Sequence, residues 1–431
     1  MITWVHSAAA LASTRHLAMK NSRVPIQPTG APAAGNSWLA IAQINVAARD
    51  PHPALRAIAP WEAATDGYND FMARGGIPRG GFMHMLYNSM TGIEGAENGA
   101  AMVEKRPLFD EYWTTKVIPV ENIDVPMYLT ASYSTRLHSR GSFETFAKAK
   151  TTKKWLRVHH TQEWYYLYRK KNNDELQAFF DKYCKGISND WHLTAPLRLS
   201  LLGFDGSRAS TIVERQEASY PLPNTEYRKY FLEATSGSMS LRRPSAEAET
   251  GYLAHHLTDC ADFHVNFNEY TEVAGYLVTK LWMSCPDHDD MDVNLQSAKT
   301  PLVSLNYPCP VPAFEVPDAN VAKFLSCDGI LRASHQVSKK MTNGFPNYRH
   351  DKAEKIAPGT VVELEIPLWP IGMVFESGEG IILRAAGDEL RLPELKVLEV
   401  KAAVDENVGR HRIHTGGQWD SCGSSYIWLK H

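Results

Sequence analysis

The sequence has little of what marks several large classes of protein. None of its six cysteines forms a C-x-x-C pair, which argues against a zinc knuckle, and their spacing describes no disulfide framework. No apolar run approaches the roughly 18 residues that a membrane-spanning helix requires. No glycine-rich phosphate loop follows a predicted strand. From these absences we expect no membrane span, no bound metal and no cofactor.

An excess of one charge is also missing. The 431 residues carry a formal net charge of -3, so no basic field favours nucleic acid or an anionic membrane surface as a partner. The apolar stretch around residue 10 is too short for a secretory signal, and we expect a cytoplasmic protein. Hydrophobic residues make up 44% of a chain that is long enough for two or three domains.

Among the features that are present, the stretch PAAGNSWLAIAQ (32–43) raises the first functional question. Small residues surround Ser37, and apolar residues then recur at helical spacing as far as Asp50-Pro51. A serine on a tight turn before a helix is either a catalytic nucleophile or an ordinary helix cap. The stretch leaves both readings open, and the choice depends on whether the rest of the chain supplies a base, an acid and an oxyanion site.

The periodicity of the chain divides it into parts. Up to about residue 190, helical spacing alternates with short apolar strands, the pattern of an α/β domain with a parallel sheet. Beyond that point, short strands alternate with turns at the spacing of an antiparallel sandwich. We therefore predict an α/β domain over 1–60 and 121–190, a helical cap insertion at 61–120 and a β-sandwich domain over 191–431.

Nine segments follow one another in an order that is more specific than any single motif. They are GNSWLA, LRAIAPWEAATDGYNDFMARGGIP, VPMYLTASYSTRLHSRGSFETF, KWLRVHHTQEW, LQAFFDKYCKG, APLRLSLLG, LRASHQ, PGTVVELEIPLWP and NVGRHRIHTGG. In this order they resemble the CocE/NonD hydrolases, the superfamily of cocaine esterase and Xaa-Pro dipeptidyl-peptidase. The resemblance covers residues 32 to about 420. It implies an α/β-hydrolase domain with a helical cap, followed by a jelly-roll domain.

The same resemblance implies serine-type hydrolysis of an ester or amide bond without a cofactor. Ser37 would be the nucleophile, and the backbone N–H of Trp38 would donate to the oxyanion. The position of the family's acid falls on Thr135 and that of its base near Gln162, and neither side chain can replace a carboxylate or an imidazole. His159 and His160, at the end of the preceding strand, are the first candidates for the base. We therefore expect a hydrolase whose activity is impaired.

Further candidates are weighed against ordinary structural roles. His138 is another possible base, although packing in the core or under the cap is the more common role of such a histidine. Tyr133 and Trp164 are predicted to line the pocket for the acyl group. The acidic stretch CPDHDDMDVNL (285–295) lacks the glycine and the final glutamate of a calcium loop, and we interpret it as a solvated turn.

The resemblance also implies several strands before the nucleophile, whereas only 34 residues precede Gly35. We therefore expect an N-terminally truncated hydrolase whose uncovered sheet edge favours homo-oligomers. Its substrate would be a small-molecule ester or a short peptide. The alternative is a non-catalytic binding or assembly protein derived from such a hydrolase. The distance from the Ser37 Oγ atom to each imidazole discriminates between the two.

Overall fold

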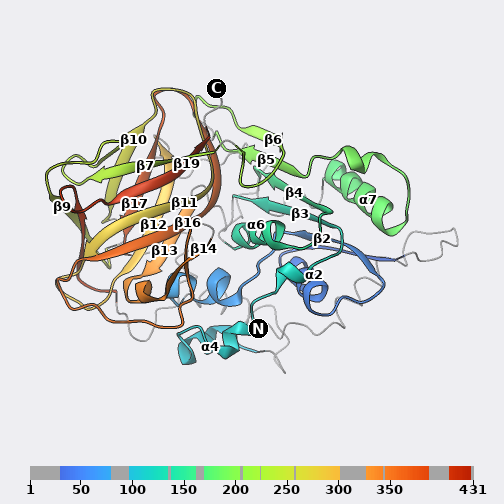
Figure 1. The fold of residues 1–431 in the computed structure, drawn as a ribbon, viewed down its shortest axis with the longest axis horizontal. Helices are drawn as coiled ribbons and strands as arrows, with labels where there is room; N and C mark the ends of the chain where they lie inside the picture. Colours follow the sequence, from blue (N-terminus) through green and yellow to red (C-terminus); the bar gives the residue numbers. More distant parts are fainter. Residues whose placement is uncertain are drawn as a thin grey trace.

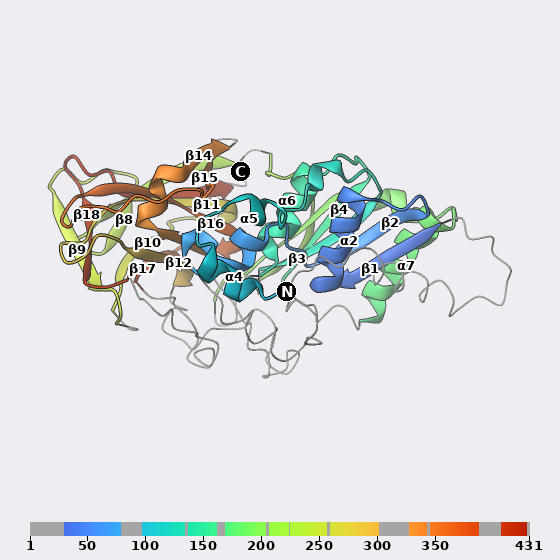
Figure 2. The same cartoon turned by 90° about the horizontal axis from the view of Figure 1, so that it is seen from below.

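The computed structural model describes residues 30–78, 97–133, 137–161, 169–203, 207–223, 225–256, 259–300, 327–342, 345–387 and 407–428. In these residues, a mostly parallel sheet with helices on both faces lies beside a larger antiparallel β-domain (Figure 1, Figure 2). The predicted order, α/β followed by all-β, is therefore observed.

The first sheet has its strands in chain order, from β1 to β6. Neighbouring strands from β1 to β5 are parallel, and β6 runs antiparallel to β5. The strands are β1 (Ala31–Asn36), β2 (Leu55–Trp61), β3 (Met127–Ser132), β4 (Lys154–His159), β5 (Leu197–Leu201) and β6 (Ile212–Glu217). Strands β5 and β6 lie beyond the predicted boundary at residue 190, and they pair with the first sheet. A short buried apolar run such as PLRLSLLG looks the same in a parallel sheet and in a sandwich.

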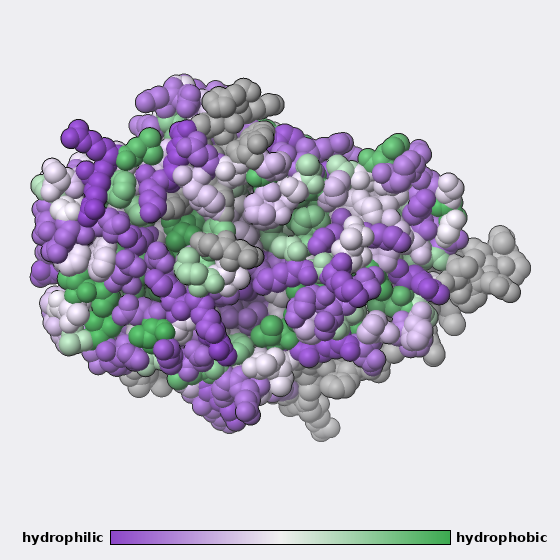
Figure 3. Space-filling view, in the orientation of Figure 1, coloured by the Kyte–Doolittle hydropathy of each residue, from purple (hydrophilic) through white to green (hydrophobic). Residues whose placement is uncertain are grey.

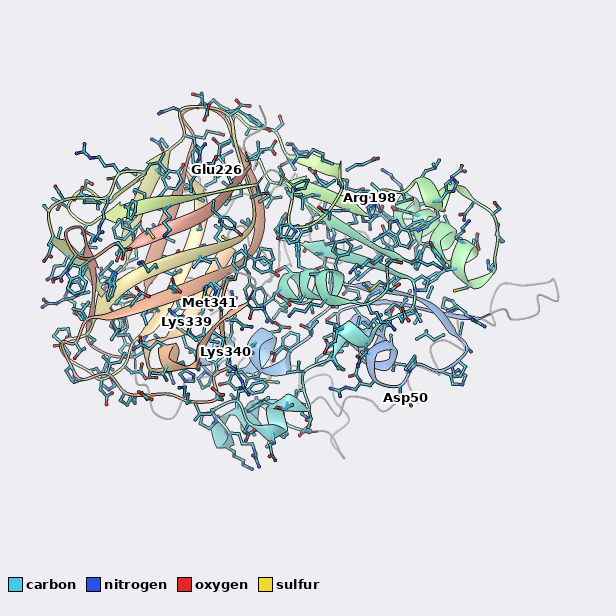
Figure 4. All side chains as sticks on the ribbon, viewed as in Figure 1. Asp50, Arg198, Glu226, Lys339, Lys340 and Met341 are labelled. Atoms are coloured by element: carbon cyan, nitrogen blue, oxygen red, sulfur yellow. The ribbon has the colours of Figure 1, made fainter. Side chains whose placement is uncertain are left out.

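Helices cover this sheet on both faces (Figure 2). Helices α2 (Trp38–Arg49) and α6 (Ser139–Lys148) pack on one face, and α7 (Lys170–Cys184) packs on the other. Side chains of β2 alternate between the two sides. Ile58 belongs to the main core with α2 and α6, whereas Trp61 belongs to an aromatic cluster with Phe179 of α7. On the α7 side, Arg198 of β5 bonds to the Tyr128 hydroxyl at 3.0 Å and pairs with Glu175 (Figure 4).

The predicted cap insertion consists of short helical turns. They are η1 (Gly67–Met72), η2 (Arg74–Gly76), α4 (Gly99–Lys105), α5 (Glu111–Thr114) and η3 (Val120–Asn122). The Asp66 carboxylate starts η1 by accepting the backbone N–H groups of Tyr68 and Asn69. Residues 79–96 of the predicted insertion lie outside the described ranges.

From β7 onward the described strands form a second sheet that is antiparallel except for the pairing of β8 with β10. Its order is β16-β13-β12-β17-β10-β8-β7-β19-β11-β18-β9. The strands are β7 (Glu226–Glu233), β8 (Ser238–Ser240), β9 (Ala248–Leu253), β10 (Ala261–Asn266), β11 (Thr271–Ser284), β12 (Asp292–Thr300), β13 (Cys327–Arg332), β16 (Val362–Phe375), β17 (Gly380–Ala386), β18 (Arg410–Thr415) and β19 (Cys422–Trp428). Because β16 also pairs with β11, the sheet closes on itself.

Smaller elements complete the described fold. The turn η5 (Asp190–Leu193) precedes β5, and the turn η8 (Ala333–Ser338) leads into a hairpin of β14 (Lys339–Thr342) and β15 (Phe345–Tyr348). Lys339, Lys340 and Met341 of this hairpin are exposed (Figure 4). The face shown in Figure 3 is largely hydrophilic, and its apolar residues are scattered between polar ones.

One continuous apolar core joins the two sheets. Between them, the backbone N–H of Leu202 donates to Gly372 at 2.8 Å, and Val374 donates to Leu202 at 3.1 Å. The insertion is anchored to β13 by a buried ion pair of 2.7 Å between Arg74 and Asp328. The Arg74 guanidinium also lies 3.9 Å from the centre of the Trp369 ring. The α/β part, the insertion and the β-domain therefore pack as one body.

Two buried histidines lie where the insertion meets the β-domain. The Nδ1 atoms of His335 and His350 are 3.1 Å apart, and the carbonyl of His350 accepts the N–H of Phe109. Burial, with Arg332 nearby, lowers the pKa of His335 to about 4. Burial, with His335 nearby, lowers the pKa of His350 to about 3. Both rings are therefore neutral at pH 7, and one donates its hydrogen bond to the other.

This pair predicts a loss of stability in acid. Both folded-state pKa values lie below the roughly 6.5 of a histidine in an unfolded chain, so unfolding takes up protons as the pH falls. The contribution of the two histidines to the free energy of unfolding is therefore complete above about pH 6.5. Below that pH the free energy of unfolding falls by up to about 1.4 kcal/mol per pH unit for each histidine. Denaturant unfolding at several pH values measures this slope. We expect a shallower slope in His335→Gln and no change in the exposed control His192→Gln. If the free energy of unfolding changed with pH equally in His335→Gln and in wild type, the lowered pKa of His335 would be contradicted.

Candidate active site

Ser37 occupies a sharp turn between β1 and α2. Its φ of 56° and ψ of -115° lie in a region that residues with a side chain rarely adopt. Its N–H donates to the carbonyl of Trp61 at 3.1 Å, and its carbonyl accepts the N–H of Ile41 at 2.9 Å. A Cβ atom at Gly35 would approach the Cβ of Leu39 to 2.4 Å, so the turn requires glycine there. The predicted tight turn before a helix is confirmed.

The hydroxyl of Ser37 does not serve as a helix cap, because it makes no capping bond to α2. Instead its Oγ atom lies 3.2 Å from Nε2 of His138. His138 is buried, immediately precedes α6 and meets the Phe71 ring edge-on at 6.2 Å between centroids. Packing was the more ordinary expectation for His138, and the structure gives its ring a polar partner as well.

His159, a first candidate for the base, reaches the same edge of the sheet but has other partners. Its Nε2 atom lies 2.8 Å from Oε1 of Glu62, and its Nδ1 atom lies 3.0 Å from Oγ1 of Thr161. Both ring nitrogens are therefore occupied away from Ser37, which corrects the expectation that this ring meets the serine. His160 follows directly after the end of β4. Sequence spacing can place a residue at the edge of a sheet, but it cannot show which neighbouring side chain the ring meets.

Glu62 lies at the same edge of the sheet and was not among the residues predicted from the sequence. It follows β2, is completely buried and has a left-handed backbone with φ 58°. Its N–H donates to Thr130 at 3.1 Å, and its carboxylate accepts the N–H of Ser132 at 3.2 Å besides contacting His159. The available signal was a carboxylate at the end of an apolar strand, because burying an anion is costly without compensating donors.

The start of α6, next to His138, is fixed against the segment that follows Glu62. The hydroxyl of Ser142 accepts the N–H of Ala63 at 2.9 Å. A Cβ atom at Gly141 would lie 2.4 Å from the Cα of Ala64, so only glycine allows this contact. Arg140 adds a bond of 2.5 Å to Asp70 of η1. Helix α6 is thus held by the residues around it, and this placement fixes the His138 ring.

The remaining predicted site residues lie in several environments. Trp38 is the first residue of α2, and the N–H groups of a first helical turn have no acceptor within the helix. Tyr133 is buried in the main core, where it stacks on Phe143 with 6.4 Å between ring centroids. Burial raises the pKa of the Tyr133 hydroxyl. Trp164, Thr135 and Gln162 lie outside the described residues.

The acidic stretch 285–295 has structural partners. Asp290 accepts the N–H groups of Met291 and Ser334, and Asp287 accepts that of Arg410. Across the ranges that the structure describes, no three His, Cys, Asp or Glu side chains are grouped to hold a metal ion. None of the helices in those ranges combines the length and the apolar character needed to cross a membrane.

Comparison with known proteins places this chain in a family. A family model of the X-Pro dipeptidyl-peptidase C-terminal non-catalytic domain matches residues 189–422. A crystal structure of a CocE/NonD family hydrolase from Staphylococcus aureus is 30% identical with a TM-score of 0.81, and the match covers 91% of this chain and 71% of that one. The chain belongs to the CocE/NonD hydrolase family. No curated protein matches it.

More distant structures share the fold of this CocE/NonD chain. An aminopeptidase from a marine sediment Thaumarchaeota archaeon is 14% identical with a TM-score of 0.68, over 92% of this chain and 77% of that one. An alpha-amino acid ester hydrolase is 13% identical with a TM-score of 0.65, over 92% and 76%. The matched C-terminal domain is described as non-catalytic, and Ser37, Glu62, His138 and His159 all precede it.

The strained turn at Ser37 predicts that a glycine variant is more stable than an alanine variant, the reverse of the usual order. Because Ser37 has φ 56°, glycine should fit the turn better than alanine. We therefore expect the free energy of unfolding of Ser37→Gly to exceed that of Ser37→Ala by about 1 kcal/mol. Thermal melting monitored by circular dichroism measures the difference. At the exposed Ser188, which does not have a positive φ, alanine should be at least as stable as glycine. The same order at both serines would contradict a strained turn.

Proposed function

We propose that this chain is a serine hydrolase that cleaves ester or amide bonds of an acyl or peptidyl substrate. The observation that carries the proposal is the 3.2 Å contact between Ser37 Oγ and His138 Nε2 at a strained strand-to-helix turn. A serine hydroxyl is a weak nucleophile until a base removes its proton, and a neutral imidazole can do so near pH 7. Membership of a hydrolase family supports the reaction class.

In this mechanism, Ser37 Oγ attacks the carbonyl carbon of the substrate while its proton passes to Nε2 of His138. The tetrahedral oxyanion accepts the N–H of Trp38 at the start of α2, where the helix dipole favours negative charge. Collapse of this intermediate breaks the bond to the leaving group, which takes the proton from His138. A water molecule then gives up a proton to His138 and hydrolyses the acyl-enzyme by the same steps.

His138 changes the expectation for activity. Impairment was expected because Thr135 and Gln162 stand where the acid and the base of the family are anticipated. With His138 as the base, an imidazole at Gln162 is not required. We therefore propose an active esterase or amidase whose substrate is a small ester or a short peptide.

Substitution of either residue tests the proposal. We expect wild-type protein to hydrolyse nitrophenyl acetate, and Ser37→Ala and His138→Gln each to lose at least about a hundredfold in kcat, since positioned base catalysis contributes about 10² to 10⁴. Absorbance of the released nitrophenolate measures the rate. Labelling by a fluorophosphonate, followed by peptide mapping, should place the adduct on Ser37.

The matched control is His192→Gln, an exposed histidine in η5 that should keep the wild-type rate. Full activity in Ser37→Ala, or an adduct on another serine, would contradict the assignment of the nucleophile. If wild type neither hydrolyses activated esters nor reacts with the probe, the non-catalytic binding or assembly protein is the better description. His160→Gln tests the remaining candidate from the sequence and should also retain activity.

A further inference from the structure

Two strained residues lie next to each other at the carboxyl edge of the parallel sheet. Asn36 of β1 pairs with Trp61 of β2, so Ser37 and Glu62 are each the first residue beyond a paired strand end. Both have left-handed backbones, with φ of 56° and 58°. Strain in residues with side chains persists only where the surroundings enforce it, and it gathers at functional sites. The strain at Glu62 therefore needs an explanation as much as that at Ser37.

The carboxyl group of Glu62 has a polar partner at each of its two oxygens. Its side chain is fully buried, and its two carboxylate oxygens face the Ser132 N–H at 3.2 Å and the His159 ring at 2.8 Å. His159 is fixed in turn by Thr161 at 3.0 Å. A buried carboxylate without such donors would be strongly destabilising. The fold thus holds a carboxylate in one position beside the serine turn.

The segment that begins at Glu62 also holds the start of α6. Ala63 donates to Ser142, and Gly141 packs against Ala64. His138 immediately precedes this helix, and its Nε2 atom faces Ser37. Two strand ends and one helix start therefore bring Ser37, Glu62 and His138 to the same edge of the sheet.

We propose that Glu62 is the charge partner of the active site. Its carboxylate stabilises the positive charge that His138 acquires when it takes the proton of Ser37, and His159 holds the carboxylate in place. This inference rests on the proposed function. Glu62, which follows β2, would provide the carboxylate that the family resemblance places at position 135, where this chain has a threonine. Glu62 acts through His138 and is therefore a positioning residue.

The decisive variant is Glu62→Gln, which keeps the side-chain volume and an oxygen for the Ser132 N–H but removes the charge. We expect kcat for nitrophenyl acetate to fall about a hundredfold with KM unchanged, because the lost interaction exists mainly in the transition state. The rate of fluorophosphonate labelling of Ser37 should fall in parallel. Glu62→Asp, which restores the charge on a shorter side chain, should recover part of the kcat.

The control is Glu214→Gln. Glu214 also has a left-handed backbone, with φ 49°, and it lies in β6 beside Arg198 rather than at the serine turn. Its loss should leave kcat unchanged. Wild-type kcat in Glu62→Gln, while Ser37→Ala and His138→Gln are inactive, would overturn the role of Glu62 and leave the proposed function standing. Full activity in Ser37→Ala would instead remove the proposed function itself.

Thermal melting of each variant shows whether a loss of kcat comes from unfolding of the protein or from the changed side chain. If Glu62→Gln does not fold, His159→Gln tests the same point, because it leaves the carboxylate present but without its imidazole donor. We expect a roughly tenfold loss of kcat in that folded variant at constant KM. A wild-type kcat in His159→Gln would then overturn the proposal.

Discussion

The left-handed turn at Ser37 is the constraint on which the site depends. Such a conformation costs about 1 to 3 kcal/mol, so it persists only because neighbouring structure enforces it. The Ser37 N–H is bound by Trp61, Gly35 leaves room for Leu39, and Ala40 is fully buried on α2. These contacts offset the strain and present the hydroxyl to His138 instead of to the backbone of its own helix. A relaxed turn would free the hydroxyl to cap α2.

The β-domain supports the position of His138 indirectly, through the insertion. Its strand β13 holds η2 of the insertion through the buried pair of Arg74 and Asp328. A Cβ atom at Gly75 would come within 2.2 Å of the Ile330 carbonyl, so the insertion lies directly against that strand. The adjoining η1 carries Phe71, whose ring meets that of His138. The β-domain can thus help to fix the imidazole by holding the segment that packs on it.

The sequence predicted the local parts of this fold better than the long-range ones. Helix α2 and the turn before it follow from the small residues around Ser37 and the helical spacing after it. Strand β1 was missed because APAAGN has little intrinsic preference for a strand, and pairing with β2 decides its conformation. The contact between Ser37 and His138 spans 101 positions in the chain, so no local pattern contains it. Glu62 was overlooked because the family pattern directed attention to Thr135.

In this structure one histidine contacts the serine and another contacts the carboxylate, whereas in a serine triad a single histidine contacts both. In a triad the same imidazole meets both the serine and the carboxylate. Here His138 meets Ser37, and His159 meets Glu62. The charge of Glu62 therefore acts on His138 through space, in a buried region where screening is weak. A Coulomb interaction of this kind falls with distance, so it is weaker than one across a direct contact. We therefore expect an effect of about a hundredfold on the rate, less than the roughly 10⁴-fold cost of neutralising a directly bonded triad carboxylate. A through-space partner would thus support catalysis more weakly than a triad acid, but it would leave the geometry of the serine and its base intact when the charge is removed.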